Sequence, residues 1–345
     1  MFSSQAALHL MLSGGIMALR VGEYCRRRCS RRRHVAAAAA VAVVVIGALS
    51  LCSGEKGFVS RGGVRFELPP PCRKVALDDG RPPAVIHRIS EPDDLEVFFV
   101  KDVIPHSELN TLVKLADARN GFQGSWQKDP STGELKKDDH RTSSSCPLLW
   151  PLMYKEAKRK AGAHQSPPEE AEAECRAVEE FVSRCAEIIG VDPLCIEPLQ
   201  LVKYLPGEHY RSHFDGHREG RQGSYAGEQR MYTLLVFAND VPASDGGGYL
   251  HFPRLGLKIL PQAGCGVLWR NTATTPDGHE ELDPRSLHEG EAPLAAEKIA
   301  VNVWAADTPF SVESVQQWQA RQAQLQANKA MQQQDEQPTS VIHLD

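Results

Sequence analysis

Residues 199–215 read LQLVKYLPGEHYRSHFD, and the fold of this chain can be predicted outward from them. The mixture of apolar and polar residues on either side of Pro206-Gly207 is typical of two strands joined by a turn. Residues two positions apart in a strand point to the same face, so His213 and Asp215 are expected to project together. One imidazole and one carboxylate are two of the three protein ligands of a non-haem Fe(II) oxygenase. An H-x-D pattern alone is also common in proteins that bind no metal.

The chain after Pro198 repeats this strand pattern. Short apolar runs bounded by Gly or Pro lie at 199–204, 209–214, 231–237, 248–252, 257–259, 266–269 and 299–304. Such runs without helices between them predict a double-stranded β-helix, or jelly roll. Two amphipathic stretches precede them, one with Ser107 as its N-cap and one from Glu169 to Ile189, and predict helices that brace one sheet. The predicted fold class is therefore α+β and mainly β.

The composition limits the class of protein. Of the 345 residues, 41% are hydrophobic and 24% are charged, which is typical of a globular chain and not of a disordered one. The formal net charge of −5 argues against a nucleic-acid partner. The nine cysteines contain no C-x-x-C pair, so the sequence predicts no zinc finger.

Residues 1–34 form a basic tail with two runs of three arginines, at 26–28 and 31–33. The next segment, 35–52, reads VAAAAAVAVVVIGALSLC, carries no charge, and has roughly the length that spans a bilayer as a helix. Because positive charge stays on the cytoplasmic side, this pattern predicts the transmembrane signal anchor of a single-pass type II membrane protein. The remainder would lie in the lumen of the endoplasmic reticulum or Golgi, where cysteines can pair. A cleaved secretory signal and an organelle transit peptide are the alternatives.

Changes in composition divide the rest of the chain into three parts. Residues 53–85 are rich in Gly, Pro and charge and predict a flexible stalk. Residues 86–310 hold the periodic segments and predict one globular domain, in which the acidic stretch TTPDGHEELDP at 274–284 is interpreted as a surface loop. Residues 311–345 predict a Gln-rich helix and a polar tail.

Three more residues support an iron site. His288 lies in a turn before a strand and could complete a set of two histidines and one carboxylate, which leaves coordination positions open for other ligands. Lys298 begins the last strand, and a buried ammonium needs an anionic partner. A dicarboxylate bound to the metal at one end would supply that partner at the other. Tyr204 offers a hydroxyl that could share the same carboxylate.

Six segments together resemble the prolyl 4-hydroxylase family of 2-oxoglutarate- and Fe(II)-dependent dioxygenases. They follow one another in the order of that family, and the resemblance covers about residues 95–307. The segments are RTSSSCPL, LQLVKYLPGEHYRSHFD, RMYTLLVFANDV, GGGYLHFP, LPQAGCGVLW and SLHEGEAPLAAEKIAVNVW. Any one of these alone is weak evidence, but their joint occurrence is specific to the family.

The resemblance implies roles for the candidate residues. His213, Asp215 and His288 would bind iron, and Lys298 would pair with the distal carboxylate of 2-oxoglutarate, which Tyr204 helps to hold. These residues lie within 86–310, which the resemblance makes the dioxygenase domain.

Other matching positions concern the substrate. Tyr210, Arg230 and Trp304 match positions on the substrate side of the site. Two blocks depart from the family pattern: its Gly-Glu-Lys-Trp block is Ala296-Glu297-Lys298-Ile299 here, and Leu250 replaces a common Thr. Neither departure affects a ligand, but both leave the choice of substrate open.

The function implied by the resemblance is that of an oxidoreductase like procollagen-proline 4-dioxygenase. It would use Fe(II), 2-oxoglutarate and O₂, with ascorbate, to convert peptidyl proline to 4-hydroxyproline, releasing succinate and CO₂. The substrate would be a proline-rich peptide or protein, whose extended polyproline II form suits an open groove. Two alternatives stay open: a hydroxylase of peptidyl lysine or a small molecule, and a catalytically silent relative that binds proline-rich peptides.

Overall fold

The computed structural model describes residues 59–76, 80–128, 135–161, 168–217 and 229–335. The basic tail at 1–34 and the predicted signal anchor at 35–52 lie outside these residues. Within the described ranges, no helix is long and apolar enough to cross a membrane.

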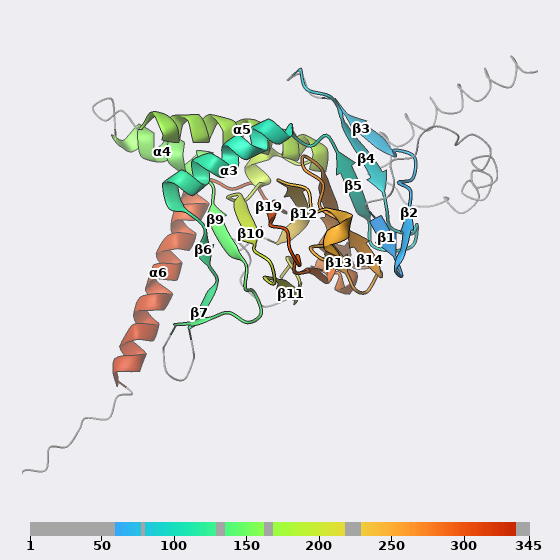
Figure 1. The fold of residues 1–345 in the computed structure, drawn as a ribbon. Helices are drawn as coiled ribbons and strands as arrows, with labels where there is room; N and C mark the ends of the chain where they lie inside the picture. Colours follow the sequence, from blue (N-terminus) through green and yellow to red (C-terminus); the bar gives the residue numbers. More distant parts are fainter. Residues whose placement is uncertain (1–58, 77–79, 129–134, 162–167, 218–228, 336–345) are drawn as a thin grey trace, which may run out of the picture. The chain divides into compact units, whose positions relative to one another are not determined.

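The strands form two main sheets, in which every described pairing is antiparallel (Figure 1). The larger sheet has the strand order β3 (Arg73–Val75), β4 (Ala84–Arg88), β5 (Val97–Lys101), β15 (Gly266–Arg270), β12 (Arg230–Phe237), β19 (Lys298–Ala306), β10 (Gln200–Tyr204), β9 (Ser144–Pro147) and β6 (Gln123–Gly124). The smaller sheet has the order β11 (Tyr210–His213), β18 (His288–Gly290), β13 (Leu250–Phe252), β14 (Leu257–Ile259), β1 (Val59–Arg61) and β2 (Val64–Phe66). All seven runs predicted after Pro198 are strands, which confirms the prediction of a mainly β fold.

Two hairpins stand apart from these sheets. One pairs β7 (Trp126–Lys128) with β8 (Leu135–Lys137), and the other pairs β16 (Thr272–Thr274) with β17 (Glu280–Leu282). In the segment at 274–284 that was predicted to be a surface loop, residues 275–279 form the loop of the second hairpin, whereas the prediction missed the strand β17. Three-residue strands are too short to show a periodic pattern, and the carboxylate of Glu280 stabilises this pair by accepting hydrogen bonds from the hydroxyls of Thr272 and Thr274.

The helices are α3 (His106–Asn120), α4 (Pro151–Ala161), α5 (Glu169–Ile189) and α6 (Val312–Asp335), with short 3₁₀ turns η2 (Pro193–Cys195), η3 (Ala243–Asp245) and η4 (Pro284–Ser286). Helices α3 and α5 lie over one face of the larger sheet, as predicted (Figure 1). Their buried side chains, such as Leu109 and Phe181, share one apolar core with Leu201 and Val301 of the sheet. Ser107 is not the N-cap of α3: Pro105 takes that position, and no side chain caps it.

The opposite face of the larger sheet packs on the smaller sheet. Alternate residues of β19 separate the two faces: Val301 and Val303 belong to the core under the helices, whereas Ala300 belongs to the core between the sheets. Phe252 of the smaller sheet and Trp269 of the larger sheet meet in this second core, edge to face at 5.3 Å between ring centroids. Two facing antiparallel sheets around a common core are the arrangement expected of a jelly roll.

The prediction of a flexible stalk at 53–85 was wrong from Val59 onward, because strands begin there. From Val59 onward the chain forms β1 and β2, joined by a turn at Gly62-Gly63, and then β3 in the other sheet. Val59 is fully buried and pairs with Ile259 of β14. Such short strands carry little signal of their own, because the partner strand supplies their hydrogen bonds.

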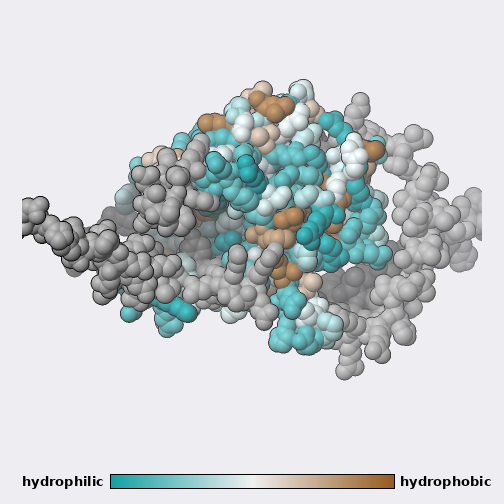
Figure 2. Space-filling view, turned by 90° about the horizontal axis from the view of Figure 1, so that it is seen from below, coloured by the Kyte–Doolittle hydropathy of each residue, from teal (hydrophilic) through white to brown (hydrophobic). Residues whose placement is uncertain are grey.

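On the face shown in Figure 2, hydrophilic residues cover most of the described surface, and hydrophobic residues form small separate groups.

The described cysteines are free thiols: Cys72, Cys146, Cys175, Cys185, Cys195 and Cys265. The disulfide pairing that a lumenal location would allow is therefore not formed among them.

Candidate metal centre

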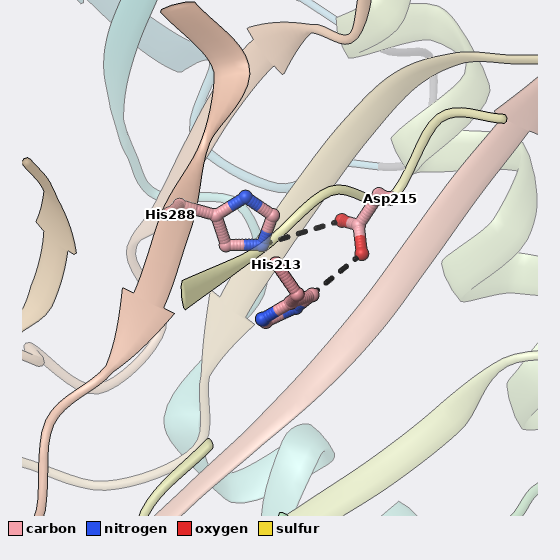
Figure 3. A group of neighbouring side chains, drawn as sticks. All are labelled: His213, Asp215 and His288. Carbon is pink, nitrogen blue, oxygen red and sulfur yellow. Dashed lines mark ion pairs between the residues drawn. The ribbon is translucent and has the colours of Figure 1, made fainter. Parts of the chain in front are cut away.

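The structure brings together the three predicted ligands from two neighbouring strands. His213 ends β11 and His288 begins β18, and the two residues are direct partners in the register of this pair. Asp215 follows two residues after His213, and Figure 3 shows its carboxylate facing both imidazoles. Its oxygens lie 3.7 Å from Nε2 of His213 and 3.6 Å from Nε2 of His288. One ligand atom from each residue lies within 4.8 Å of the other two, so a single ion could contact all three.

Backbone carbonyls orient both imidazoles in the same way. Nδ1 of His213 lies 2.8 Å from the carbonyl oxygen of Arg211, and Nδ1 of His288 lies 2.9 Å from that of Ser286. Because a carbonyl only accepts, each Nδ1 carries the proton and donates it. Each Nε2 is then left with a free lone pair directed into the site, which is the form in which histidine binds a metal.

The charges of the three groups also suit a divalent cation. Burial, with a smaller contribution from His288, lowers the pKa of His213 to about 3, so its imidazole is neutral near pH 7. Burial alone would raise the pKa of Asp215, but the nearby His288, His213 and Arg230 and the Thr233 hydroxyl outweigh it and lower the pKa to about 2. Two imidazole nitrogens and one carboxylate oxygen form the donor set of a non-haem Fe(II) site, so these residues fit that ion.

A cavity of about 290 Å³ extends from this cluster between the two sheets. Lys298 lines it and is only 4% exposed. Its Nζ donates to the carbonyl oxygen of Glu291 at 3.0 Å and lies 4.1 Å from the ring centroid of Tyr204. Burial lowers the pKa of Lys298 to about 7, against an opposing contribution from Glu291. Such a lysine would be stabilised as the cation by an anion that enters the cavity.

Tyr204 forms the adjacent wall of this cavity. Burial raises the pKa of its hydroxyl to about 12, so the group stays protonated and can donate a hydrogen bond. The hydroxyl lies so close to Gly290 that a Cβ at that position would approach it to 2.8 Å. Gly290 is therefore needed for the tyrosine to occupy this place.

The predicted substrate-side residues line the same cavity. The ring of Tyr210 stacks on His213, with 3.5 Å between ring centroids. The guanidinium of Arg230 lies 3.8 Å from the ring centroid of Trp304 and donates two hydrogen bonds, at 2.7 and 2.8 Å, to the carboxylate of Glu197. Glu197 was not predicted from the sequence. It is 1% exposed, and no periodic pattern marks one acidic residue before a proline.

Residues 199–306, which include the three predicted ligands and Lys298, match the family model described as the 2OG-Fe(II) oxygenase superfamily. Fe(II), 2-oxoglutarate and O₂ are the cofactor and co-substrates of that class. The relatives are more specific. The chain is 27% identical to prolyl 4-hydroxylase subunit alpha-1 of Gallus gallus over 206 residues, which are 59% of this chain and 34% of that protein. It is 25% identical to the Rattus norvegicus subunit over 217 residues, 62% of this chain and 35% of that protein.

These findings confirm the predicted resemblance to the prolyl 4-hydroxylase family of dioxygenases. The chain spans about a third of the length of the two curated relatives. Among solved structures, it is similar to a viral collagen prolyl hydroxylase from Paramecium bursaria Chlorella virus-1, in its 2OG complex. The sequence identity is 21% and the TM-score 0.42, over 61% of this chain and 96% of the viral one.

Proposed function

We propose that this chain hydroxylates peptidyl proline to 4-hydroxyproline as a 2-oxoglutarate- and Fe(II)-dependent dioxygenase. The observation that carries the proposal is the convergence of His213, Asp215 and His288 in one cavity with the buried Lys298. The reaction consumes 2-oxoglutarate, O₂ and a substrate C–H bond, and it releases succinate, CO₂ and the hydroxylated product.

His213, Asp215 and His288 would hold the ferrous ion. The bound ion would supply the redox chemistry that activates O₂ and couples the decarboxylation of 2-oxoglutarate to hydroxylation. Lys298, as the ammonium, would pair with the distal carboxylate of 2-oxoglutarate, and Tyr204 would donate its hydroxyl proton to the same group. This pairing fixes the co-substrate at the end that does not react.

The remaining cavity wall would exclude water during the reaction. Phe237, Leu250 and Trp269 line the cavity and are at most 5% exposed. Leu250, at the position of the common family Thr, adds an apolar surface where that residue would offer a hydroxyl. An apolar wall strengthens the electrostatic contacts of Lys298 with an anion and prevents water from competing for them.

A peptide substrate is supported by the relatives, which are prolyl 4-hydroxylase subunits, and by the aromatic and cationic residues that line the cavity. Tyr210 and Trp304 each present a ring with a guanidinium beside it, from Arg141 at 4.9 Å and from Arg230 at 3.8 Å. Rings and guanidinium groups of this kind suit a proline ring and its flanking peptide carbonyls.

The test is succinate formation by the full-length protein with Fe(II), ascorbate and 2-oxoglutarate. Proline-rich, collagen-like and lysine-containing peptides are compared as substrates, and the product is identified by mass spectrometry. We expect stimulation by the proline peptides alone, with 4-hydroxyproline as product and no activity in His213→Ala. Equal activity of His213→Ala, or hydroxylation of lysine in place of proline, would contradict the proposal.

We further propose that the segment 35–52 anchors the protein in the membrane of the endoplasmic reticulum or Golgi, with the dioxygenase domain in the lumen. The arginines before the segment and its uncharged length support this orientation. Protease protection in microsomes tests it, with fragments after residue 53 expected to survive until detergent is added. Digestion of these fragments in intact vesicles would rule out the proposed orientation.

A further inference from the structure

A chain of hydrogen bonds between buried side chains ends on the carboxylate of Asp215. Nε1 of Trp269 donates to Oδ1 of Asn271 at 2.9 Å, and Nδ2 of Asn271 donates to Oγ1 of Thr233 at 2.9 Å. Oγ1 of Thr233 donates to Oδ2 of Asp215 at 2.8 Å. Trp269, Asn271 and Thr233 are at most 1% exposed. No water can replace a lost partner at such depth, so each bond constrains the next one.

The chemistry of the donors fixes the direction of every bond in this chain. An indole N–H can only donate, so the carbonyl oxygen of Asn271 must face Trp269 and its NH₂ group must face Thr233. A hydroxyl has one proton. Because the oxygen of Thr233 accepts from Asn271, the hydroxyl directs that proton to the carboxylate of Asp215. The indole therefore determines, through Asn271, that the Thr233 hydroxyl donates its proton to the carboxylate of Asp215.

The backbone of Asn271 is itself held in place. Its N–H donates to the carbonyl of Met231 at 2.8 Å, and its carbonyl accepts from the N–H of Asp283 at 2.9 Å. The hydroxyl of Ser286 lies 3.4 Å from the same carbonyl. Ser286 is the residue whose own carbonyl orients His288. The chain that reaches Asp215 is thus anchored on the turn that positions a second ligand.

We propose that Asn271 is a positioning residue for the metal centre: it holds the Thr233 hydroxyl in the orientation that fixes the carboxylate of Asp215. The inference rests on the metal centre proposed above. Asn271 is not among the residues that line the cavity, and it reaches Asp215 only through Thr233. It prevents rotation of the Asp215 carboxylate, which otherwise has a broad torsional minimum. Loss of such a partner typically weakens metal affinity about 10- to 100-fold.

Titration of the full-length protein with Mn(II) tests this role without turnover. Free Mn(II) is followed by electron paramagnetic resonance, in the absence of 2-oxoglutarate. Thr233→Val and Asn271→Leu each remove one link and keep the number of side-chain heavy atoms. We expect each to raise the Kd for Mn(II) about 10- to 100-fold. The double variant should bind no more weakly than the weaker single variant, because both changes break the same chain.

Thr272→Val is the matched control. Thr272 is the next residue, is 1% exposed, and donates its hydroxyl proton to Glu280 at 2.7 Å, but this bond leads to no metal ligand. Its loss should lower the urea midpoint and leave the Kd for Mn(II) unchanged. Thr233→Ser keeps the hydroxyl and should bind Mn(II) like the parent. If Asn271→Leu does not fold, the Kd values of Thr233→Ser and Thr233→Val for Mn(II) test the positioning role.

Two results would overturn the positioning role. Thr233→Val and Asn271→Leu proteins could bind Mn(II) as tightly as the parent, or Thr272→Val could weaken binding to the same extent. His213→Ala separates this failure from a failure of the metal centre. If the parent binds Mn(II) no better than His213→Ala, the centre itself is refuted, and the positioning role with it.

Discussion

Replacing Lys298 with methionine is predicted to stabilise the ligand-free protein while it removes the binding of 2-oxoglutarate. Methionine has a similar length and no charge. The side chain is 4% exposed, and burial lowers the pKa of Lys298 from 10.5 to about 7. At about 1.4 kcal/mol per pH unit, this shift corresponds to a cost of roughly 4 to 5 kcal/mol for the buried ammonium. Loss of the hydrogen bond to Glu291 offsets about 1 kcal/mol, which leaves a gain of about 3 kcal/mol.

This gain should depend on pH with a definite sign. Between the folded pKa of about 7 and the unfolded value of 10.5, the unfolded chain binds more protons at Lys298 than the folded one. The stability of the parent therefore rises with pH through this window, whereas the variant lacks this contribution. The advantage of Lys298→Met is complete below about pH 7 and falls to roughly 1 kcal/mol at pH 9.

Urea unfolding at pH 6 and pH 9 measures the stability, and calorimetry with Mn(II) present measures 2-oxoglutarate affinity. We expect the affinity to fall at least about 100-fold, because the distal carboxylate would be buried without a counter-charge. Lys258→Met is the control: this lysine pairs with Glu291 at the surface, and its loss should change stability by less than about 1 kcal/mol. An unchanged midpoint at pH 6, or a gain that does not vary with pH, refutes the buried-ammonium argument. Retained affinity refutes the co-substrate role.

Three further changes have defined outcomes. Gly290→Ala should raise the KM for 2-oxoglutarate, since the new Cβ displaces the Tyr204 hydroxyl, and steady-state kinetics beside Tyr204→Phe checks this. Asp245→Asn should cost about 1 to 3 kcal/mol in urea unfolding at pH 7, because the carboxylate accepts hydrogen bonds from the backbone N–H groups of 247 and 294–296. These bonds lower the pKa of Asp245, so the difference should shrink as acid protonates the parent; a constant difference argues against this account. Phe181→Ala should lower stability by about 3 to 5 kcal/mol without changing Mn(II) affinity; altered affinity would mean that the helix layer also shapes the site.

The sequence was sufficient where one element carries its own signal. The strands β10, β12 and β19 are five to nine residues long and contain apolar runs of high strand propensity, so they could be predicted before their partners were known. His213 ends β11, whereas Asp215 lies two residues beyond it, so the strand pattern accounts for the first ligand only. The binding of iron by these residues stays a prediction, which the structure makes testable by bringing His288 beside them.

The sequence was insufficient for short strands and single side chains whose role depends on groups remote in the sequence. Strands β1, β2 and β3 have three residues each, and a flexible stalk was predicted in their place. β1 pairs with β14, which lies far away in the sequence, β2 pairs with β1, and β3 pairs with β4. Glu197 and Asn271 show the same limit for side chains. Each is a single buried polar residue, and its role depends on the groups that face it.

By itself, the amino-acid sequence determined the mainly β fold class, the two bracing helices and the candidate ligand and lysine positions. These features depend on local periodicity and on segments that resemble one family. Only the tertiary structure decided that Lys298 is buried with a lowered pKa, that Gly290 makes room for Tyr204, and that Asn271 reaches Asp215. The physical reason is that burial and hydrogen bonding depend on distances between strands that are remote in sequence, and no local pattern encodes those distances.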